Sequence, residues 1–202
     1  MEGLHMDKDR FHKQLDFLVE IDKLKTVLRQ SLIIDKSKRE NSAEHSWHIA
    51  LMGTILYEYC DKDKVNLARA VKMALVHDII EVYAGDTFAF DLEGYKDKQE
   101  REQEAADKIF GMLPEDQGIE LRKLWEEFEA METYDARFAA AMDRLQPFIL
   151  NYHTEGHTWK LGNVNSKMVY KRIGVLKEAC PDLWNNIDEM IKDSIEKGYL
   201  KE

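Results

Sequence analysis

Four residues in three separate stretches of the chain have side chains that suit one metal site: His45, the adjacent pair His77 and Asp78, and Asp143. The pair lies in an apolar run, MALVHDIIEVYAGD, where a buried carboxylate needs a compensating positive charge. Imidazole and carboxylate are ordinary ligands of divalent cations, and this mixture of nitrogen and oxygen donors suits several first-row metals. The pattern therefore indicates a divalent metal ion.

Two more carboxylates follow the His-Asp pair closely. Glu81 comes four residues after His77 and three after Asp78, so a continuous helix would place it one turn along the same face. Asp86 comes next, in the adjoining loop. A carboxylate beside a metal can accept a proton from a bound water or return one to a leaving group. The sequence thus has the parts for metal-assisted hydrolysis.

The elements that must position these residues are predicted to be helices. Apolar residues spaced three or four apart predict a first helix that runs through Arg29 and buries the face Phe11, Leu15, Leu18, Ile21, Leu24 and Leu28. Asn41-Ser42 and Asn66 can cap the helices that carry His45 and the His-Asp pair.

Later helices are expected over about 97–110, 115–131 and 134–152, and the last of these carries Asp143. Two final helices begin near residues 165 and 181, and irregular segments are expected over 84–95 and 153–165. The pattern predicts an all-α fold of about seven or eight helices in one compact domain over 1–202. Its core covers about 10–155, and C-terminal helices over 166–199 pack on it.

Composition limits the function classes. The 202 residues are 44% hydrophobic and 34% charged, which is typical of a globular chain, and the net charge is −10. That charge disfavours a nucleic-acid polymer as partner, since phosphate backbones need a cationic face. Neither a signal-peptide apolar stretch nor a run of 18 apolar residues is present, and Cys60 and Cys180 form no Cys-x-x-Cys pair. These features predict a cytoplasmic protein without a membrane partner.

The arrangement His…His-Asp…Asp on successive helices resembles the HD-domain metal-dependent phosphohydrolases. The segments RENSAEHSWHIALM, MALVHDIIEVYAGDT and AAMDRLQP are most similar to the branch that contains bacterial 5′-deoxynucleotidase and related small HD-domain hydrolases. The resemblance covers roughly residues 10–155. It implies an HD-domain helical bundle, a small nucleotide substrate and a homodimer.

The same resemblance implies one divalent metal ion, because no His or Cys stands between Asp78 and Asp143 to complete a second site. Its nitrogen and oxygen ligands are compatible with Mn, Co, Fe, Ni or Zn, and Mg is less suited to two imidazoles. The implied ligands are His45, His77, Asp78 and Asp143.

Further roles follow residue by residue from the resemblance. Glu81 matches the catalytic acid or base of that branch, and Asp86 matches its neighbouring functional carboxylate. Arg29 matches an arginine that approaches the substrate phosphate. Gln30 stands where the deoxynucleotidase carries an aromatic side chain that helps select the sugar, so discrimination between deoxyribose and ribose is expected to be weak.

Each of the three residues Glu81, Asp86 and Arg29 also has a purely structural interpretation. Glu81 could be a salt-bridge partner, Asp86 a turn residue beside Gly85, and Arg29 a solvated helix charge. For the whole chain, the leading interpretation is a phosphomonoesterase that hydrolyses nucleoside 5′-monophosphates. The alternative is a non-catalytic or regulatory HD protein that binds metal or nucleotide. Intact Glu81 and Asp86 favour the enzyme, because a sensor needs only the ligands.

Overall fold

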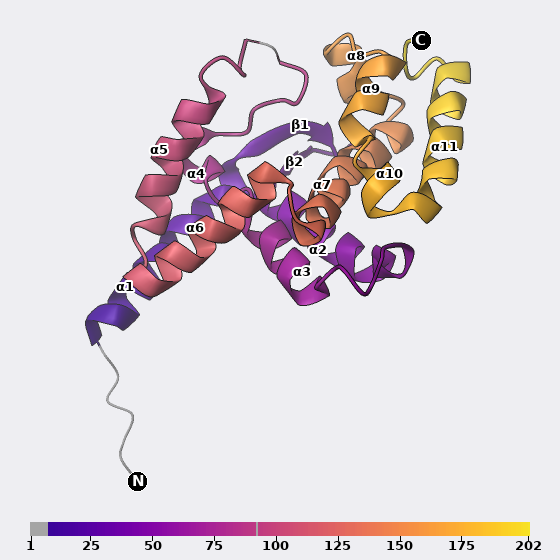
Figure 1. Ribbon diagram of the computed structural model, residues 1–202. Coiled ribbons are helices and arrows are strands. Elements are labelled where there is room, and N and C mark those ends of the chain that lie inside the picture. Colours follow the sequence, from indigo (N-terminus) through magenta and orange to yellow (C-terminus); the bar gives the residue numbers. More distant parts are fainter. Residues whose placement is uncertain (1–7, 92) are drawn as a thin grey trace.

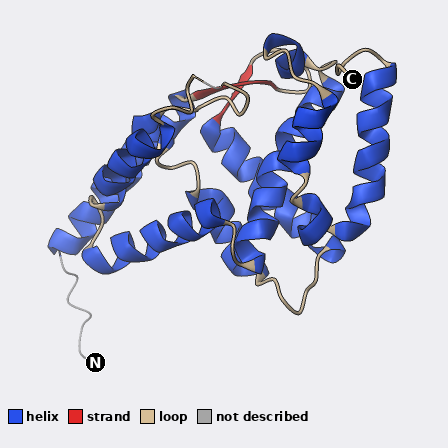
Figure 2. Cartoon of the chain, turned by 45° about the horizontal axis from the view of Figure 1, so that its top comes forward, coloured by secondary structure: helices blue, strands red, loops and turns tan. Residues whose placement is uncertain are grey.

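The computed structural model describes residues 8–91 and 93–202, and helices dominate this part of the chain (Figure 2). The all-α prediction is therefore confirmed. Eight of the described α-helices have eight or more residues, namely α1 Lys8–Ile21, α2 Ser42–Leu56, α3 Leu67–Val76, α5 Lys98–Phe110, α6 Glu115–Ala130, α7 Tyr134–His153, α9 Ser166–Ile173 and α11 Trp184–Glu196. Short turns of helix join them: α4 Glu81–Ala84, α8 His157–Leu161, α10 Leu176–Ala179, and the 3₁₀ segments η1 Asp22–Thr26, η2 Tyr57–Tyr59 and η3 Pro181–Leu183.

Side-chain caps fix where the helices of the site begin. The Asn41 side chain accepts a hydrogen bond from the Glu44 amide at 2.9 Å, and the Glu44 side chain accepts one from the Asn41 amide at 3.1 Å. This reciprocal capping box satisfies two backbone donors that the first turn of a helix leaves open. Asn66 caps α3 in the predicted way. His45 is thereby held in the first turns of α2.

The predicted continuous first helix is wrong. Helix α1 ends at Ile21, η1 follows, and the chain then forms strand β1, Leu28–Leu32, which pairs antiparallel with β2, Arg39–Asn41. Strand pairing supplies backbone partners that three- and four-residue apolar spacing does not reveal. Arg29 therefore lies on a strand of a two-stranded sheet, and this hairpin lies over one end of the helices of the site (Figure 1).

The predicted buried face of α1 is also wrong. Phe11, Leu15 and Leu18 are 45%, 44% and 59% exposed, whereas Phe17 is buried, and Leu24 of η1 is buried as well. Helix α1 ends early and lies at one side of the molecule (Figure 1). It therefore buries the side chain of Phe17 and not a whole apolar face.

The His-Asp pair lies just beyond α3 and not within a continuing helix. Helix α3 ends at Val76, and residues 77–80 form tight turns before α4 begins at Glu81. The Glu81 amide donates to the Asp78 carbonyl at 2.9 Å, a three-residue spacing characteristic of 3₁₀ geometry. The prediction of one helix through Glu81 is corrected accordingly.

Two hydrophobic clusters lie on either side of the site. The larger joins α2, α3 and α7 to the C-terminal helices, with Ile49, Phe138 and Ile191 almost fully buried within it. The smaller joins α1, α5 and α6 around Phe17 and Ile109. Leu121 packs against both clusters, so we propose that they belong to one domain, which a single calorimetric unfolding transition would support. No helix in the described ranges is both long and apolar enough to span a membrane.

Candidate metal centre and substrate pocket

Three elements that are distant in sequence bring the predicted ligands together. His45 comes from α2, His77 from the turn after α3, and Asp143 from the middle of α7. Asp143 Oδ1 lies 3.0 Å from His45 Nε2 and 3.7 Å from His77 Nε2. One donor atom from each residue lies within 4.8 Å of the other two, as a shared metal ion requires.

Asp78 borders this trio of donor atoms. Its Oδ1 lies 2.9 Å from His77 Nε2, and its Oδ2 lies 3.9 Å from His45 Nε2. The same Oδ2 accepts a hydrogen bond from Arg29 Nη1 at 3.2 Å. Asp78 therefore lies between the cluster and Arg29.

The hydrogen bonds of the two imidazoles suit metal binding. His45 Nδ1 lies 3.0 Å from Gln146 Oε1, and His77 Nδ1 lies 2.8 Å from the Ala74 carbonyl. Both oxygens only accept, so each Nδ1 donates its proton to them, and a ring that has released its Nε2 proton would present that lone pair to the cluster. Among the described side chains, His77 Nε2 is a buried nitrogen without a properly oriented hydrogen bond. A cation at this point would satisfy it.

The charges of the cluster shift its pKa values in opposite directions. Burial alone would lower the pKa of His77, but the Asp78 and Asp143 carboxylates raise it well above its usual value. Burial and the nearby Arg29 lower the pKa of His45. Burial opposes ionisation of Asp143, yet hydrogen bonds and charges from the two histidines hold its pKa well below the ordinary range. The Asp143 carboxylate is thus ionised and available as a ligand.

Glu81 and Asp86 adjoin the centre, where they were predicted. Glu81 is buried, and its Oε2 accepts a hydrogen bond from Ser42 Oγ at 2.5 Å. Burial, reinforced by the Asp78 charge, raises the pKa of Glu81 well above its usual value. Burial also raises the pKa of Asp86, against the opposing charge of Arg29. Both groups can therefore hold a proton more readily than ordinary carboxyls.

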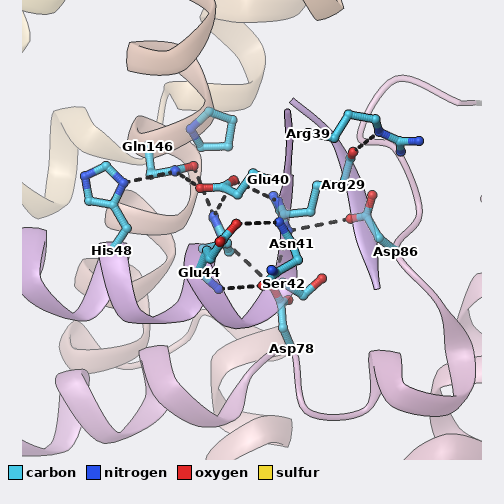
Figure 3. A network of polar contacts seen from close by, with 12 residues as sticks. Arg29, Arg39, Glu40, Asn41, Ser42, Glu44, His48, Asp78, Asp86 and Gln146 are labelled. Atoms are coloured by element: carbon cyan, nitrogen blue, oxygen red, sulfur yellow. Dashed lines mark hydrogen bonds and ion pairs between the residues drawn. The ribbon is translucent and has the colours of Figure 1, made fainter. Parts of the chain in front are cut away.

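Arg29 is a buried cation among carboxylates, and the interpretation as a solvated charge is excluded. Its Nη1 lies 3.2 Å from Asp78 and 3.6 Å from Asp86, and its Nε lies 3.5 Å from Glu40 Oε2 (Figure 3). Burial favours the neutral form, but the surrounding carboxylates raise its pKa and keep it charged. A permanent planar cation beside the cluster suits recognition of a phosphate.

Three polar residues of this region were not identified from the sequence. Gln146 follows Asp143 by three residues in α7 and is a polar side chain on a buried helix face. A polar residue at such a position is the sequence signal that could have identified it. Glu40 precedes the α2 cap, and nothing in its spacing marks it. Arg172 of α9 places Nη2 3.8 Å from Asp143 Oδ2, a contact that needs the tertiary structure.

A pocket opens over the cluster. Its floor contains His77, Asp78 and Asp143, and Arg29 and Gln30 line it from β1. The other walls combine aromatic and cationic side chains, including Phe88, Phe90, Trp159, Arg144 and Arg172. Phe88 and Phe90 meet edge to face with ring centroids 5.6 Å apart. Such a pocket fits a ligand that has both an anionic group and a flat ring.

Solved structures show the same arrangement of helices. A chain from Magnetospirillum magnetotacticum described as a predicted metal-dependent phosphohydrolase superposes with a TM-score of 0.91 at 48% identity, covering 96% of each chain. The PH0347 protein from Pyrococcus horikoshii is 20% identical, with a TM-score of 0.64 over 88% of this chain and 98% of its own, and supports the fold alone.

Curated relatives are similar over most of the same region. A human protein named 5′-deoxynucleotidase HDDC2 is 34% identical over 133 residues, which are 65% of this chain and 63% of that protein. The zebrafish protein of the same name is 28% identical over 156 residues, or 77% and 76% of the two chains. The match thus spans less than two thirds of the human relative's length. The HD-domain family model matches residues 21–184. By that match this chain belongs to the HD-domain family.

Proposed function

We propose that this protein is a metal-dependent phosphomonoesterase that hydrolyses nucleoside 5′-monophosphates to nucleoside and phosphate. The observation that carries the proposal is the convergence of His45, His77 and Asp143 donors within 4.8 Å beside a buried arginine. The names of the similar proteins, a metal-dependent phosphohydrolase and 5′-deoxynucleotidases, support the same reaction class.

In this proposal His45, His77, Asp78 and Asp143 hold one divalent ion. Two imidazoles and two carboxylates suit Mn, Co, Fe, Ni or Zn better than Mg. When bound, the ion would supply Lewis-acid activation of a water and neutralise charge on the phosphate. The Nδ1 hydrogen bonds to Gln146 and Ala74 hold the two rings with Nε2 facing the ion.

The remaining groups divide the work of binding and proton transfer. Arg29 orients the phosphate through its guanidinium, which can contact two oxygens at once. Glu81 accepts a proton from the attacking water and returns one to the 5′ oxygen that leaves, and Ser42 holds its carboxyl in place. Asp86 lies on the far side of Arg29 from Glu40 and helps to fix that guanidinium.

A homodimer is part of the proposal. Trp47, Leu51 and Ile55 of helix α2 form an exposed apolar stripe at four-residue spacing. A contiguous row of exposed large apolar side chains is typical of a contact with another protein. A second copy of this chain is the proposed occupant, because a two-fold contact places the same stripe against itself.

The metal ligands can be tested by elemental analysis. We expect His77→Ala and Asp143→Ala proteins to lose the bound ion, since each removes a donor from the cluster. His48→Ala is the control and should keep it, because His48 contacts Gln146 and not the trio of donor atoms. Full metal content in both ligand variants would exclude this site.

Glu81 should separate catalysis from metal binding. Glu81→Gln keeps the shape of the side chain but cannot take up a proton, so we expect about a 10²-fold or larger fall in kcat. Metal content should not change. The exposed Glu93→Gln variant should match the wild type in both measurements. A wild-type kcat in Glu81→Gln would contradict a role of Glu81 in proton transfer and leave it a structural role.

Arg29→Lys tests phosphate binding and the sugar. Lysine keeps the charge but loses the planar fork, so kcat/KM for AMP and dAMP should fall together, while metal content stays constant. Arg137→Lys, a partly buried position in the first turn of α7, is the control. Because Gln30 offers no aromatic wall, wild-type kcat/KM for AMP and dAMP should differ by less than about 10²-fold. A larger deoxy preference would assign sugar selection to another residue, and no hydrolysis with any metal would favour a non-catalytic role.

The dimer can be tested by sedimentation. Ile55→Glu places a charge in the exposed stripe of α2, so we expect the sedimentation coefficient to fall from that of a dimer to that of a monomer. Ile119→Glu, at an exposed apolar position on α6, is the control and should remain dimeric. A wild-type protein that is monomeric at all concentrations would end this proposal.

A further inference from the structure

Two buried polar side chains, Glu40 and Gln146, lie next to the proposed metal centre, and the mechanism above assigns no role to Glu40. Glu40 of β2 is 3% exposed, and Gln146 of α7 is fully buried. Figure 3 shows them side by side, with Arg29 on one side and His48 on the other. Buried polar groups of this kind are costly unless their hydrogen bonds are satisfied, so their partners identify what they do.

Gln146 connects Glu40 to a proposed metal ligand. Its Nε2 donates to Glu40 Oε1 at 2.5 Å, and its Oε1 lies 3.0 Å from His45 Nδ1. A carboxylate oxygen only accepts here, so Glu40 fixes which end of the amide is the donor. The other end then accepts from His45 and holds the proton on Nδ1. The order of donors along the chain of contacts thus sets the His45 tautomer.

The second oxygen of Glu40 faces Arg29. Glu40 Oε2 lies 3.5 Å from Arg29 Nε, and neither atom has a hydrogen-bond partner in the described part of the chain. Both atoms are buried; burial raises the pKa of Glu40 to about 7, and the positive charge of Arg29 opposes that rise. Arg29 directs Nη1 toward Asp78 and Asp86, on the side of the pocket. Glu40 therefore faces the Nε edge of the guanidinium, and Nη1 lies on the side of the pocket.

We propose that Glu40 is a positioning residue for both halves of the site. Through Gln146 it sets the His45 imidazole for metal binding, and directly it sets the Arg29 guanidinium for phosphate binding. The inference rests on the proposed function, because it assumes the metal ligands and the role of Arg29. A purely structural ion pair would not divide its two oxygens between these two groups.

The effect of Glu40 on His45 and its effect on Arg29 can be measured separately by calorimetry, with Mn²⁺ and inorganic phosphate as probes. Gln146→Met removes the acceptor for His45, so Mn²⁺ affinity of the metal-free protein should fall about 10- to 100-fold, the usual scale for an outer partner of a ligand. Glu40→Gln can still accept from Gln146 but turns an amide toward Arg29. Mn²⁺ affinity should therefore stay within about threefold, while phosphate binding to the Mn²⁺-saturated protein weakens about tenfold.

A swapped pair provides the rescue. In the double variant Glu40→Gln with Gln146→Glu, residue 40 donates and residue 146 accepts from His45. Mn²⁺ affinity should return to the wild-type value, whereas phosphate binding should stay weak because Arg29 still lacks its carboxylate. The swap also carries the test if Glu40→Gln alone does not fold. Glu44→Gln is the matched control, since its amide oxygen can keep the α2 cap, and both affinities should remain at wild-type values.

Three results would overturn the inference. The first is wild-type Mn²⁺ affinity in Gln146→Met, and the second is wild-type phosphate affinity in the swapped pair. Equal loss of both affinities in every folded variant would also overturn it, since that indicates a structural role alone. Failure of the proposed function is distinguishable, because His77→Ala would then retain the metal.

Discussion

Repulsion among buried carboxylates is the constraint on which the rest of this structure depends. Glu40, Asp78, Glu81, Asp86 and Asp143 converge on one small region, and Arg29 is the cation placed among them. Two unit charges 4 Å apart interact by about 4 kcal/mol at an effective dielectric of 20. Arg172, 3.8 Å from Asp143, and His77, whose pKa the carboxylates raise, are the other cationic groups beside these carboxyls. Burial raises the pKa values of Glu81 and Asp86, the Asp78 charge adds to that rise, and a divalent ion would offset the negative charge.

The charged residues of the site come mostly from the ends of helices and from turns, which the fold brings to one place. His45 is held by the capped start of α2, the His-Asp pair by the turn that ends α3, and Arg29 by the hairpin above them. Only Asp143 comes from the interior of a long helix. Turns and helix starts can direct a side chain more freely than a helix face can. The backbone groups that these interruptions leave open are met by caps such as the Asn41–Glu44 box.

The sequence predicted the parts of this arrangement that depend on local signals. Asn41 and Asn66 marked helix starts through a cap that needs only three neighbouring residues, and the structure has both. Apolar spacing failed where tertiary contacts decide. Leu24 and Leu28 continue the spacing of α1, but strand pairing with β2 ends the helical pattern before Leu28. Residue types suggested the grouping of His45, His77 and Asp143, and the family resemblance supported it, but the distances between their donor atoms depend on tertiary structure.

Glu40 and Gln146 show why the supporting residues of a site are hard to read from a sequence. Their significance lies in which atom faces which partner across 106 residues of chain, and residue type alone does not record that. Because the residues of the site are far apart in the sequence, ligand binding at the site also affects the stability of the folded state. Arg29, His45, His77 and Asp143 meet only when β1, α2, α3 and α7 are assembled, so the unfolded chain has no such site. A ligand that binds the assembled site alone stabilises the fold by about 2.7 kcal/mol at a hundred times its dissociation constant. Binding of a divalent ion would therefore both relieve the repulsion among the carboxylates and stabilise the assembly of β1, α2, α3 and α7.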